Sequence, residues 1–254
     1  MGGGCDFQHV MYLVPRGMMD VADSLAAIKK RVFEEGLVSK KELTDALAVN
    51  FEGKESIRKL LLSAPKFGND DDYVDSIAAD LYRWLCELMD SIDAPYGVKW
   101  VNAPHNLSGH GAQGRKVGAL PSGRLAGTSI SDGALSPCQG ADVKGCTAVI
   151  ESCGKVDQLP MYGTLLNMKF HPSALKTKED LENFVSLIKT YLVDYGGKHI
   201  QFNVVSRETL LDAQAHPENY RSLVVRVAGY SALWVELDRV IQDEIINRTE
   251  YSKV

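Results

Sequence analysis

Glycine at position 229 lies in the apolar segment VVRVAGYSAL, residues 224–233, whose pattern otherwise predicts a buried strand. Glycine weakens a strand, because it packs no side chain and loses the most backbone entropy on ordering. One interpretation is a tight turn or a close approach of two backbones. The other is chemical: glycine can lose one of its two Cα hydrogens and become a planar radical shared with the flanking amide nitrogen and carbonyl. The residue alone leaves both interpretations open.

Five cysteines could supply thiols for nucleophilic, redox or metal chemistry. They are Cys5, Cys86, Cys138, Cys146 and Cys153. An odd number of cysteines in a chain without a secretory signal argues against a disulfide framework, so we expect reduced thiols. The last three are separated by seven and six residues, whereas zinc sites pair cysteines through C-x₂₋₄-C spacings. This spacing disfavours a zinc site.

Two further segments carry polar patterns that could bind a cation or a phosphate. Asp70, Asp71 and Asp72 lack the alternating oxygen ligands and the glycine of a calcium loop, so we interpret them as a solvated helix start. Residues 95–145 are rich in Gly, Pro, Ser and basic residues, which predicts a long ordered loop or a set of loops. That segment lacks the G-x-x-x-x-G-K-S/T motif and a preceding strand, which disfavours nucleotide binding.

Composition sets the class of protein and of partner. The chain has 254 residues, of which 45% are hydrophobic, enough for one large or two small globular domains. A formal net charge of -5 without a Lys/Arg cluster argues against nucleic acid and anionic membranes, which leaves small molecules and proteins as partners. No apolar run reaches the roughly 18 residues of a membrane span. The start MGGGCDFQHV lacks the regions of a signal peptide, so we expect a cytoplasmic protein.

The first hundred residues predict helices. Residues 19–36 form one, ending at Gly36, a residue suited to a helix C-terminus. Its predicted apolar face comprises Val21, Leu25, Ile28, Val32 and Phe33. Ser39 and Glu42 have the spacing of a capping box at the start of the next helix.

Residues 69–92 predict a longer helix, with Asn69 or Asp70 as its N-cap. Acidic residues at its start favour the positive end of the helix dipole. Its predicted apolar face comprises Tyr73, Ile77, Leu81, Leu85 and Leu88.

The second half alternates helices with strands. Strands are predicted for residues 198–205 and 222–228, and helices for residues 177–197, 206–214 and 237–249. The segment CTAVIESC fits either a strand or a short helix. Such alternation predicts an α/β fold in which neighbouring strands run parallel.

The segment around Gly229 is similar to a known family. RVAGY (226–230), preceded by QFNVVSRETLLDAQAHPENYRSLVV and followed by SALWVELDRVIQDEIINRT, resembles the C-terminal glycine radical domain of the glycyl radical enzymes, the pyruvate formate-lyase superfamily. The segments AGYSAL and NMKFHPSAL resemble the corresponding sequences of the dehydratase, choline-lyase and arylacetate-decarboxylase branches. The resemblance covers nearly the whole chain, since it extends through residues 164–175, 118–142, 64–75 and 21–36.

The resemblance implies a fold and a division of the chain. Residues 1–117 correspond to the C-terminal part of the pyruvate formate-lyase-like barrel domain, and residues 118–254 to the glycine radical domain. We therefore expect the C-terminal portion of a ten-stranded α/β barrel, with N-terminal helices and a buried loop around Gly229. Arg226 and Tyr230 match the family motif, and we expect them to anchor and pack this loop.

The resemblance also implies a function. In this family a separate iron–sulfur activating enzyme uses S-adenosylmethionine to abstract a hydrogen from the glycine that aligns with Gly229. The stored radical passes to a cysteine thiol on an opposing loop, and the thiyl radical attacks a small substrate whose C–C, C–O or C–N bond is cleaved. We expect no bound cofactor or metal in the chain itself, because the activating enzyme carries the cofactor chemistry.

The chain departs from the family in its length. Members are considerably longer, and their catalytic cysteine lies upstream of the matched part. Cys5 and Cys146 are weak candidates for the thiyl residue, and His171 is expected to order a loop. We therefore expect the C-terminal part of a lyase, whether a fragment, a truncated product or a separate subunit. Such a part should join another chain in a homo- or hetero-oligomer, or be unstable alone, because it exposes strand edges.

Two other functions remain open. The chain could be a non-catalytic spare part that complements another chain whose glycine radical domain is damaged by oxygen, or it could be an inert remnant. The length of the chain and the segment AGYSAL favour the C-terminal part of a lyase. The known proteins that replace a damaged glycine radical domain are shorter and resemble pyruvate formate-lyase itself.

Overall fold

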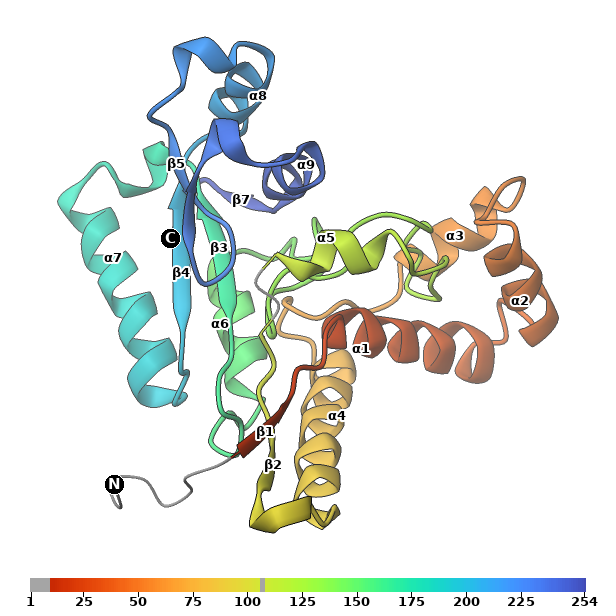
Figure 1. Ribbon diagram of the computed structural model, residues 1–254. Coiled ribbons are helices and arrows are strands. Elements are labelled where there is room, and N and C mark those ends of the chain that lie inside the picture. The colour runs from red at the N-terminus through yellow and green to blue at the C-terminus, as the bar shows by residue number, and fades with distance from the viewer. Residues whose placement is uncertain (1–9, 106–107) are drawn as a thin grey trace.

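The structure, a computed structural model, describes residues 10–105 and 108–254, and its N-terminal half is mostly helical (Figure 1). The helices are α1 (Met18–Ala27), which continues as the π-helical segment η1 (Ile28–Glu34), α2 (Lys40–Ala48), α3 (Glu55–Leu62) and α4 (Asp72–Ser91). Strands β1 (Val10–Leu13) and β2 (Lys99–Asn102) pair in parallel, and β2 contacts α4. None of the described helices is both long enough and apolar enough to cross a membrane.

The segment predicted as a long loop, residues 95–145, contains some regular structure. It includes the short turn η2 (Pro95–Gly97), strand β2 and helix α5 (Gly109–Gly114). From residue 115 to residue 145 the chain has neither helix nor strand, and the guanidinium of Arg124 orders much of it. This side chain donates hydrogen bonds to the carbonyl oxygens of Gly114, Gly118 and Ser129 at 2.8, 3.0 and 3.2 Å. The prediction of an ordered loop is confirmed for this part.

The C-terminal half alternates helices and strands, as predicted. The elements are α6 (Cys146–Gly154), β3 (Leu166–Phe170), η3 (Pro172–Leu175), α7 (Lys178–Lys189) continuing as η4 (Thr190–Asp194), β4 (Ile200–Val204), α8 (Arg207–Ala215), η5 (Pro217–Asn219), β5 (Val224–Arg226), β6 (Ser231–Leu233), η6 (Trp234–Glu236), α9 (Arg239–Asn247) and β7 (Glu250–Tyr251). The segment CTAVIESC, which fitted a strand or a helix, is helical and forms most of α6.

The described strands form three small sheets. Strand β3 lies between β4 and β7, and all three run parallel, as the alternation predicted. Strands β5 and β6 are the exception, because the chain reverses between them and pairs them antiparallel. The predicted strand over 222–228 is therefore shorter than expected and forms one arm of a hairpin.

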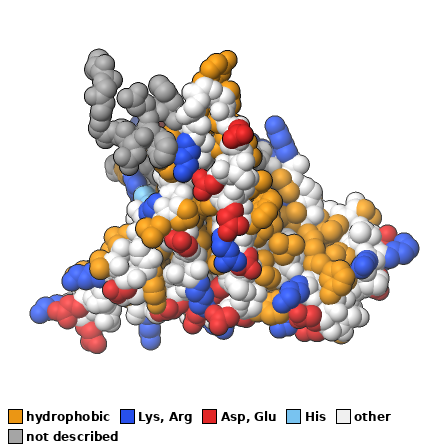
Figure 2. All heavy atoms as spheres, turned by 90° about the horizontal axis from the view of Figure 1, so that it is seen from below, with side chains coloured by type: hydrophobic (Ala, Val, Ile, Leu, Met, Phe, Trp, Pro, Cys, Tyr) orange, Lys and Arg blue, Asp and Glu red, His pale blue; other side chains and the backbone are white. Residues whose placement is uncertain are grey.

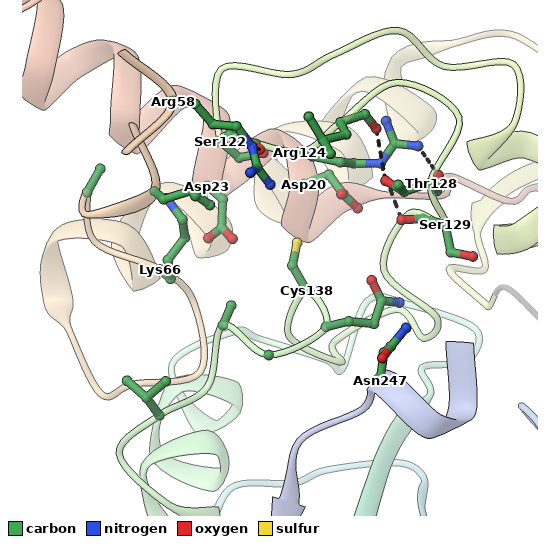
Figure 3. A pocket seen from close by; sticks show the side chains of 18 of the residues that line it. Asp20, Asp23, Arg58, Lys66, Ser122, Arg124, Thr128, Ser129, Cys138 and Asn247 are labelled. Carbon is green, nitrogen blue, oxygen red and sulfur yellow. Dashed lines mark hydrogen bonds between the residues drawn. The ribbon is translucent and has the colours of Figure 1, made fainter. Parts of the chain in front are cut away.

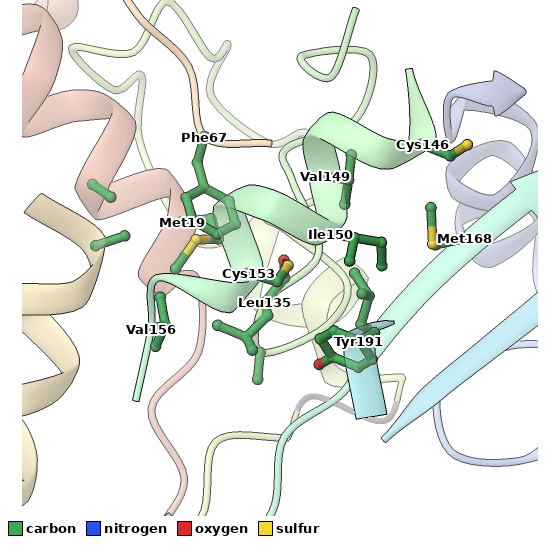
Figure 4. Packing of buried hydrophobic residues seen from close by; sticks show 14 of the residues in the cluster. Met19, Phe67, Leu135, Cys146, Val149, Ile150, Cys153, Val156, Met168 and Tyr191 are labelled. Carbon is green, nitrogen blue, oxygen red and sulfur yellow. The ribbon is translucent and has the colours of Figure 1, made fainter. Parts of the chain in front are cut away.

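The two faces of the β3–β4 pair differ in chemistry. Leu166, Met168 and Phe170 on β3 lie in the largest hydrophobic cluster, where Phe170 packs against Phe202 of β4 with their rings 5.9 Å apart. Residues of α6 fill the same cluster, as Figure 4 shows for Val149, Ile150 and Cys153 beside Met168. The alternate residues point to the other face, and all of them are buried and polar: Asn167, Lys169, Gln201 and Asn203.

The apolar face predicted for the first helix is wrong for three of its five residues, since Ile28 and Val32 do pack against a hydrophobic cluster. Val21 and Leu25 are 42% and 41% exposed, and Phe33 is 64% exposed. The buried face instead carries Met19 and the small residues Ala22 and Ala26, which allow α1 to pack closely against α4. Hydrophobic side chains are also widespread on the face seen from below in Figure 1 (Figure 2). The chain therefore exposes hydrophobic side chains of a kind that are normally buried in a core or an interface.

The buried face of α4 is rotated by one residue from the prediction. Val74, Ala78, Tyr82 and Met89 are buried, whereas Tyr73, Ile77 and Leu81 pack at its margin, and Leu85 was predicted correctly. The hydroxyl of Tyr82 donates to the carbonyl of Ala134 at 2.6 Å, which fixes this rotation.

Helix caps were predicted with mixed success. The capping box is confirmed, with the Ser39 hydroxyl accepting from the Glu42 amide and the Glu42 carboxylate accepting from the Ser39 amide. The N-cap of α4 is Asp71, rather than Asn69 or Asp70, because the Asp71 carboxylate accepts from the amide of Tyr73 at 3.0 Å.

The acidic residues at the start of α4 bind a cation from the chain itself. Lys155, directly after α6, places its ammonium 2.7 Å from Asp70, 2.6 Å from Asp72 and 2.9 Å from Asp75. Asp75 is fully buried and also accepts from the Ser152 hydroxyl at 3.0 Å. This ion cluster joins the N-terminal helices to α6.

Replacing the lysine should therefore destabilise the fold. In Lys155→Met the buried Asp75 carboxyl loses its ammonium partner, which should lower the unfolding free energy by up to about 3 kcal/mol, the lower end for a buried pair, because Lys155 is partly exposed. Urea unfolding of the variant would measure this loss. Lys144→Met, an exposed control, should change the free energy by less than about 0.5 kcal/mol. Adding Asp75→Asn to Lys155→Met should restore part of the loss, and equal stability of wild type and Lys155→Met would contradict the role of the cluster.

Candidate functional site

Gly229 lies at the tip of the β5–β6 hairpin rather than inside a strand. Its φ of +79° lies in the left-handed region, which glycine adopts without strain. The amide of Val227 donates to the carbonyl of Tyr230 at 2.9 Å and closes the turn. The turn interpretation is therefore right for the backbone, and it leaves the chemical interpretation open.

The burial expected for this loop is wrong in part. Val227 and Ala228 are buried, but Gly229 and Tyr230 are exposed. The hairpin contacts β4 (Figure 1), and Gly229 at its tip remains exposed. A radical on Gly229 would therefore be open to oxygen in this chain.

Two side chains of β4 hold the hairpin. Asn203 acts like a neighbouring backbone peptide: its Oδ1 accepts from the amide of Arg226 at 2.8 Å, and its Nδ2 donates to the Arg226 carbonyl at 2.7 Å. Gln201 Oε1 accepts from the amide of Gly229 at 3.0 Å and from the guanidinium of Arg226 at 2.9 Å. Arg226 also donates to the hydroxyl of Ser231 at 3.1 Å, so the anchoring role predicted for Arg226 is confirmed.

A buried guanidinium holds the other side of the hairpin. Arg248, which follows α9, donates to the carbonyl of Val227 at 2.7 Å, two residues before Gly229. The same guanidinium contacts Glu244 at 2.8 and 2.9 Å and Asp132 at 3.2 Å. All three charged side chains are buried.

Histidine and amide groups extend this cluster. His110 of α5 lies 3.1 Å from Glu244 through its Nε2, and Asn167 of β3 donates to Asp132. The cluster therefore joins α5, α9, β3 and the loop after residue 130 to the carbonyl that precedes the hairpin tip.

The charges in this cluster compensate one another. Burial would raise the pKa of Glu244, but Arg248 and His110 lower it to about 2. Burial would lower the pKa of His110, but its hydrogen bond to Glu244 raises it above its ordinary value. Burial also raises the pKa of Asp132, against the opposing charge of Arg248. Glu244 and Arg248 are therefore a firmly ionised pair.

Lys169 supports the same end of α9. Its buried ammonium donates to the carbonyls of Ile245 and Ile246 at 3.3 and 3.0 Å, at the negative end of the helix dipole. Glu250 lies 3.9 Å away. Burial lowers the pKa of Lys169 to about 8, so these carbonyls receive a proton donor in either charge state.

Sequence reasoning missed Gln201, Asn203, Arg248 and the other polar members of this site. A signal was present in the strands, because Asn167 and Lys169, like Gln201 and Asn203, occupy alternate positions among apolar residues. A strand buried on both faces usually reads as apolar throughout. Polar residues at every second position therefore indicate that one face contacts something polar.

Among the residues that the structure describes, no cysteine belongs to a group of side chains that could hold a metal ion. Cys146 and Cys153 lie on α6 in the hydrophobic core (Figure 4), and burial raises the pKa of both thiols. Cys138 packs at the margin of the same hydrophobic cluster and faces a cavity (Figure 3). Cys5 falls outside the described residues, so its candidacy as the thiyl residue stays a prediction.

His171 orders a turn, as predicted. Its Nδ1 accepts from the amide of Ser173 at 3.1 Å and caps η3. His171 also lies near Glu208 and Glu250, a grouping that could hold a metal ion. The Glu250 carboxylate already accepts from the amide of Arg207 at 2.7 Å, so this group has a structural partner.

A cavity of about 1040 Å³ opens between α1, the loops around residues 122–129 and 138–144, and α9. Figure 3 shows Asp20, Asp23 and Cys138 directed into it. Asp23 is fully buried, and its Oδ1 accepts from the amide of Phe67 at 2.8 Å. Burial raises the pKa of Asp23 to about 7 and that of the Cys138 thiol well above its ordinary value. At neutral pH this thiol is therefore protonated.

Two protein-family models match two separate parts of the chain. Residues 131–235 match Glycine radical, and residues 1–111 match Pyruvate formate lyase-like. The first match contains the hairpin, β3, β4 and Asp132. The chain belongs to the glycyl radical enzyme family. The resemblance found in the sequence is thus confirmed.

Individual relatives are similar over a limited part of their own length. Indoleacetate decarboxylase from Tractidigestivibacter scatoligenes is 41% identical, over 98% of this chain and 31% of the relative. The structure of hydroxyproline dehydratase from Clostridioides difficile is 40% identical with a TM-score of 0.91, over 95% of this chain and 30% of that one. The structure of B12-independent glycerol dehydratase from Clostridium butyricum is 42% identical with a TM-score of 0.90, over 98% of this chain and 32% of that one. The chain therefore spans about 30% of the length of these relatives.

The raised pKa of Asp23 predicts a pH dependence of stability. Its ordinary value is 3.8 and its folded value is about 7, so the folded protein binds this proton more tightly than the unfolded chain. The resulting stability is fully present below about pH 4 and is lost as the pH rises to about 7, by at most about 1.4 kcal/mol per pH unit.

Asp23→Asn can keep the hydrogen bond to Phe67 but cannot titrate. Relative to this variant, wild type should lose stability between about pH 4 and 7 and no more above that range. Urea unfolding at several pH values measures the difference. A difference between the two proteins that stays constant over this range would refute the raised pKa.

Proposed function

We propose that Gly229 is the site of a stored glycyl radical, and that the chain is the radical-storing C-terminal part of a glycyl radical lyase. One observation carries the proposal. The glycine of RVAGY lies at a hairpin tip that two buried polar side chains hold: Gln201 accepts from the Gly229 amide, and Arg248 donates to the Val227 carbonyl two residues earlier. This tip falls within the residues that match the Glycine radical description.

The radical requires a second protein to form it. In the proposal, an S-adenosylmethionine-dependent iron–sulfur activating enzyme removes one hydrogen atom from Cα of Gly229. The exposed position of Gly229 supports this step, because an activating enzyme must reach the Cα–H bond. Tyr230, which is also exposed, would meet the same partner.

The proposed catalytic assembly includes chain that is not in these 254 residues. The open hairpin tip and the exposed Val21, Leu25 and Phe33 support a covering partner, since relatives are about three times longer. That partner would complete the ten-stranded barrel in an oligomer, shield the radical from oxygen and supply the cysteine thiol that receives it. We place the boundary between the two domains at residues 117 and 118, and the assembly in the cytoplasm.

The proposed reaction is the cleavage of a C–C, C–O or C–N bond in a small substrate. Relatives named as decarboxylase and dehydratase support the first two. The alternative is a non-catalytic radical subunit that complements another chain, and a third is an inert remnant.

Electron paramagnetic resonance tests the radical. After anaerobic incubation with a matched activating enzyme and S-adenosylmethionine, the chain should show a doublet, because one hydrogen remains on the radical carbon. Gly229→Ala should abolish it. Gly163→Ala is the matched control, because a Cβ there has open space and the doublet should persist. A wild-type chain without a doublet, under conditions that activate a related enzyme, would reduce the protein to a remnant.

Turnover then separates the lyase part from the spare part. Substrate cleavage that appears only when a complementing chain with its own cysteine is added supports the split lyase. A doublet that forms and persists without turnover, in the presence of such a chain and substrates of the related lyases, would favour the non-catalytic subunit.

A further inference from the structure

We infer that Gln201 is a positioning residue for the radical carbon, an inference that rests on the proposed function. Gln201 is 5% exposed and lies on the polar face of β4, beneath the hairpin. Its Oε1 accepts from the amide of Gly229 at 3.0 Å. It is therefore a side chain in direct contact with the peptide group that would share the unpaired electron.

The orientation of the Gln201 amide follows from its two donors. The Gly229 amide and the Arg226 guanidinium both donate to the same Gln201 atom, at 3.0 and 2.9 Å. Neither donor can accept a hydrogen bond, so this atom is the oxygen. Arg226 thus fixes the side chain of Gln201, and Gln201 in turn fixes the amide of Gly229.

Fixing this amide controls how well the radical is stabilised. A radical at Cα spreads onto the amide nitrogen and the carbonyl only when the carbon and both flanking groups are close to coplanar. In the closed-shell hairpin Gly229 has a φ of +79°, so its backbone must rotate when the carbon flattens. The bond to Gln201 holds the 228–229 peptide group while the rotation takes place, which gives the radical one defined geometry.

This role differs from that of the other contacts to the hairpin. Asn203 binds both backbone groups of Arg226, and Arg248 binds the carbonyl of Val227, so these two hold the hairpin as a whole. Among the contacts described, Gln201 is the one made to Gly229 itself. The Gln201 Nε2 is buried without an acceptor among the described residues, so the packing of this side chain is set by its oxygen.

Two variants separate the acceptor from the rest of the side chain. Gln201→Met keeps the length but removes the acceptor, whereas Gln201→Glu keeps an oxygen that both donors can reach. Gln113→Met, an exposed position on α5, is the matched control for the substitution. Circular dichroism and thermal unfolding of the 254-residue chain would establish that each variant folds.

Amide hydrogen exchange of Gly229, measured by nuclear magnetic resonance on the unactivated chain, tests the contact without any radical. Loss of one hydrogen bond should speed exchange about threefold to tenfold in Gln201→Met. Gln201→Glu and Gln113→Met should stay close to wild type. Equal exchange in Gln201→Met and wild type would overturn the inference.

The radical signal tests the consequence for chemistry. In activated protein, Gln201→Met should broaden the doublet or change its splitting and shorten its lifetime, and Gln201→Glu should restore the wild-type signal. An unchanged signal in Gln201→Met would overturn the positioning role. If exchange responds as expected but wild type itself gives no doublet, the contact stands and the proposed function fails.

Discussion

The buried guanidinium of Arg248 is the group on which the arrangement of the C-terminal half depends. It pairs with Glu244 one turn earlier in α9 and with Asp132 in the loop after residue 130, and it donates to the carbonyl of Val227 in the hairpin. Removing one partner of such a buried pair costs about 3–5 kcal/mol, because the remaining charge is left uncompensated. Helix, loop and hairpin are therefore held in one arrangement, with Gly229 two residues beyond the anchored carbonyl.

The β3–β4 pair supports the hairpin from below, through side chains of β4. One face is apolar and packs on α6 and α7, as parallel sheets commonly do. The other face carries buried polar side chains. The β5–β6 hairpin packs on this face, and its backbone amides and carbonyls need hydrogen-bond partners there. Asn203 and Gln201 supply these partners to the hairpin with their side-chain amides. Gly229 is thus held on a rigid support while it remains exposed, an arrangement that the proposed radical site would require.

The sequence predicted the architecture better than the surfaces. Alternation of helices and strands and the Ser39 capping box were readable from local patterns. For Gly229, local pattern left the turn and the chemical interpretation open, and the radical role remains a prediction that rests on the family resemblance. The buried face of α1 was not readable from local patterns, because Val21 and Leu25 are exposed in this chain and the helix packs through Met19 and alanines. The role of Arg248 could not be predicted from local sequence either, because its partner Asp132 lies 116 residues away and only the tertiary structure brings them together. Burial of Gly229 was expected from a family architecture of which the chain contains about a third.

The central claim, that Gly229 is the radical site, is tested most directly by the products of oxygen exposure. A carbon-centred backbone radical reacts with oxygen and the chain is cut at that residue. Mass spectrometry of activated protein after exposure to air should therefore find a C-terminal piece that begins near Tyr230, in proportion to the radical signal that is lost. A chain that loses its radical signal in air but remains whole, or is cut elsewhere, would contradict the claim.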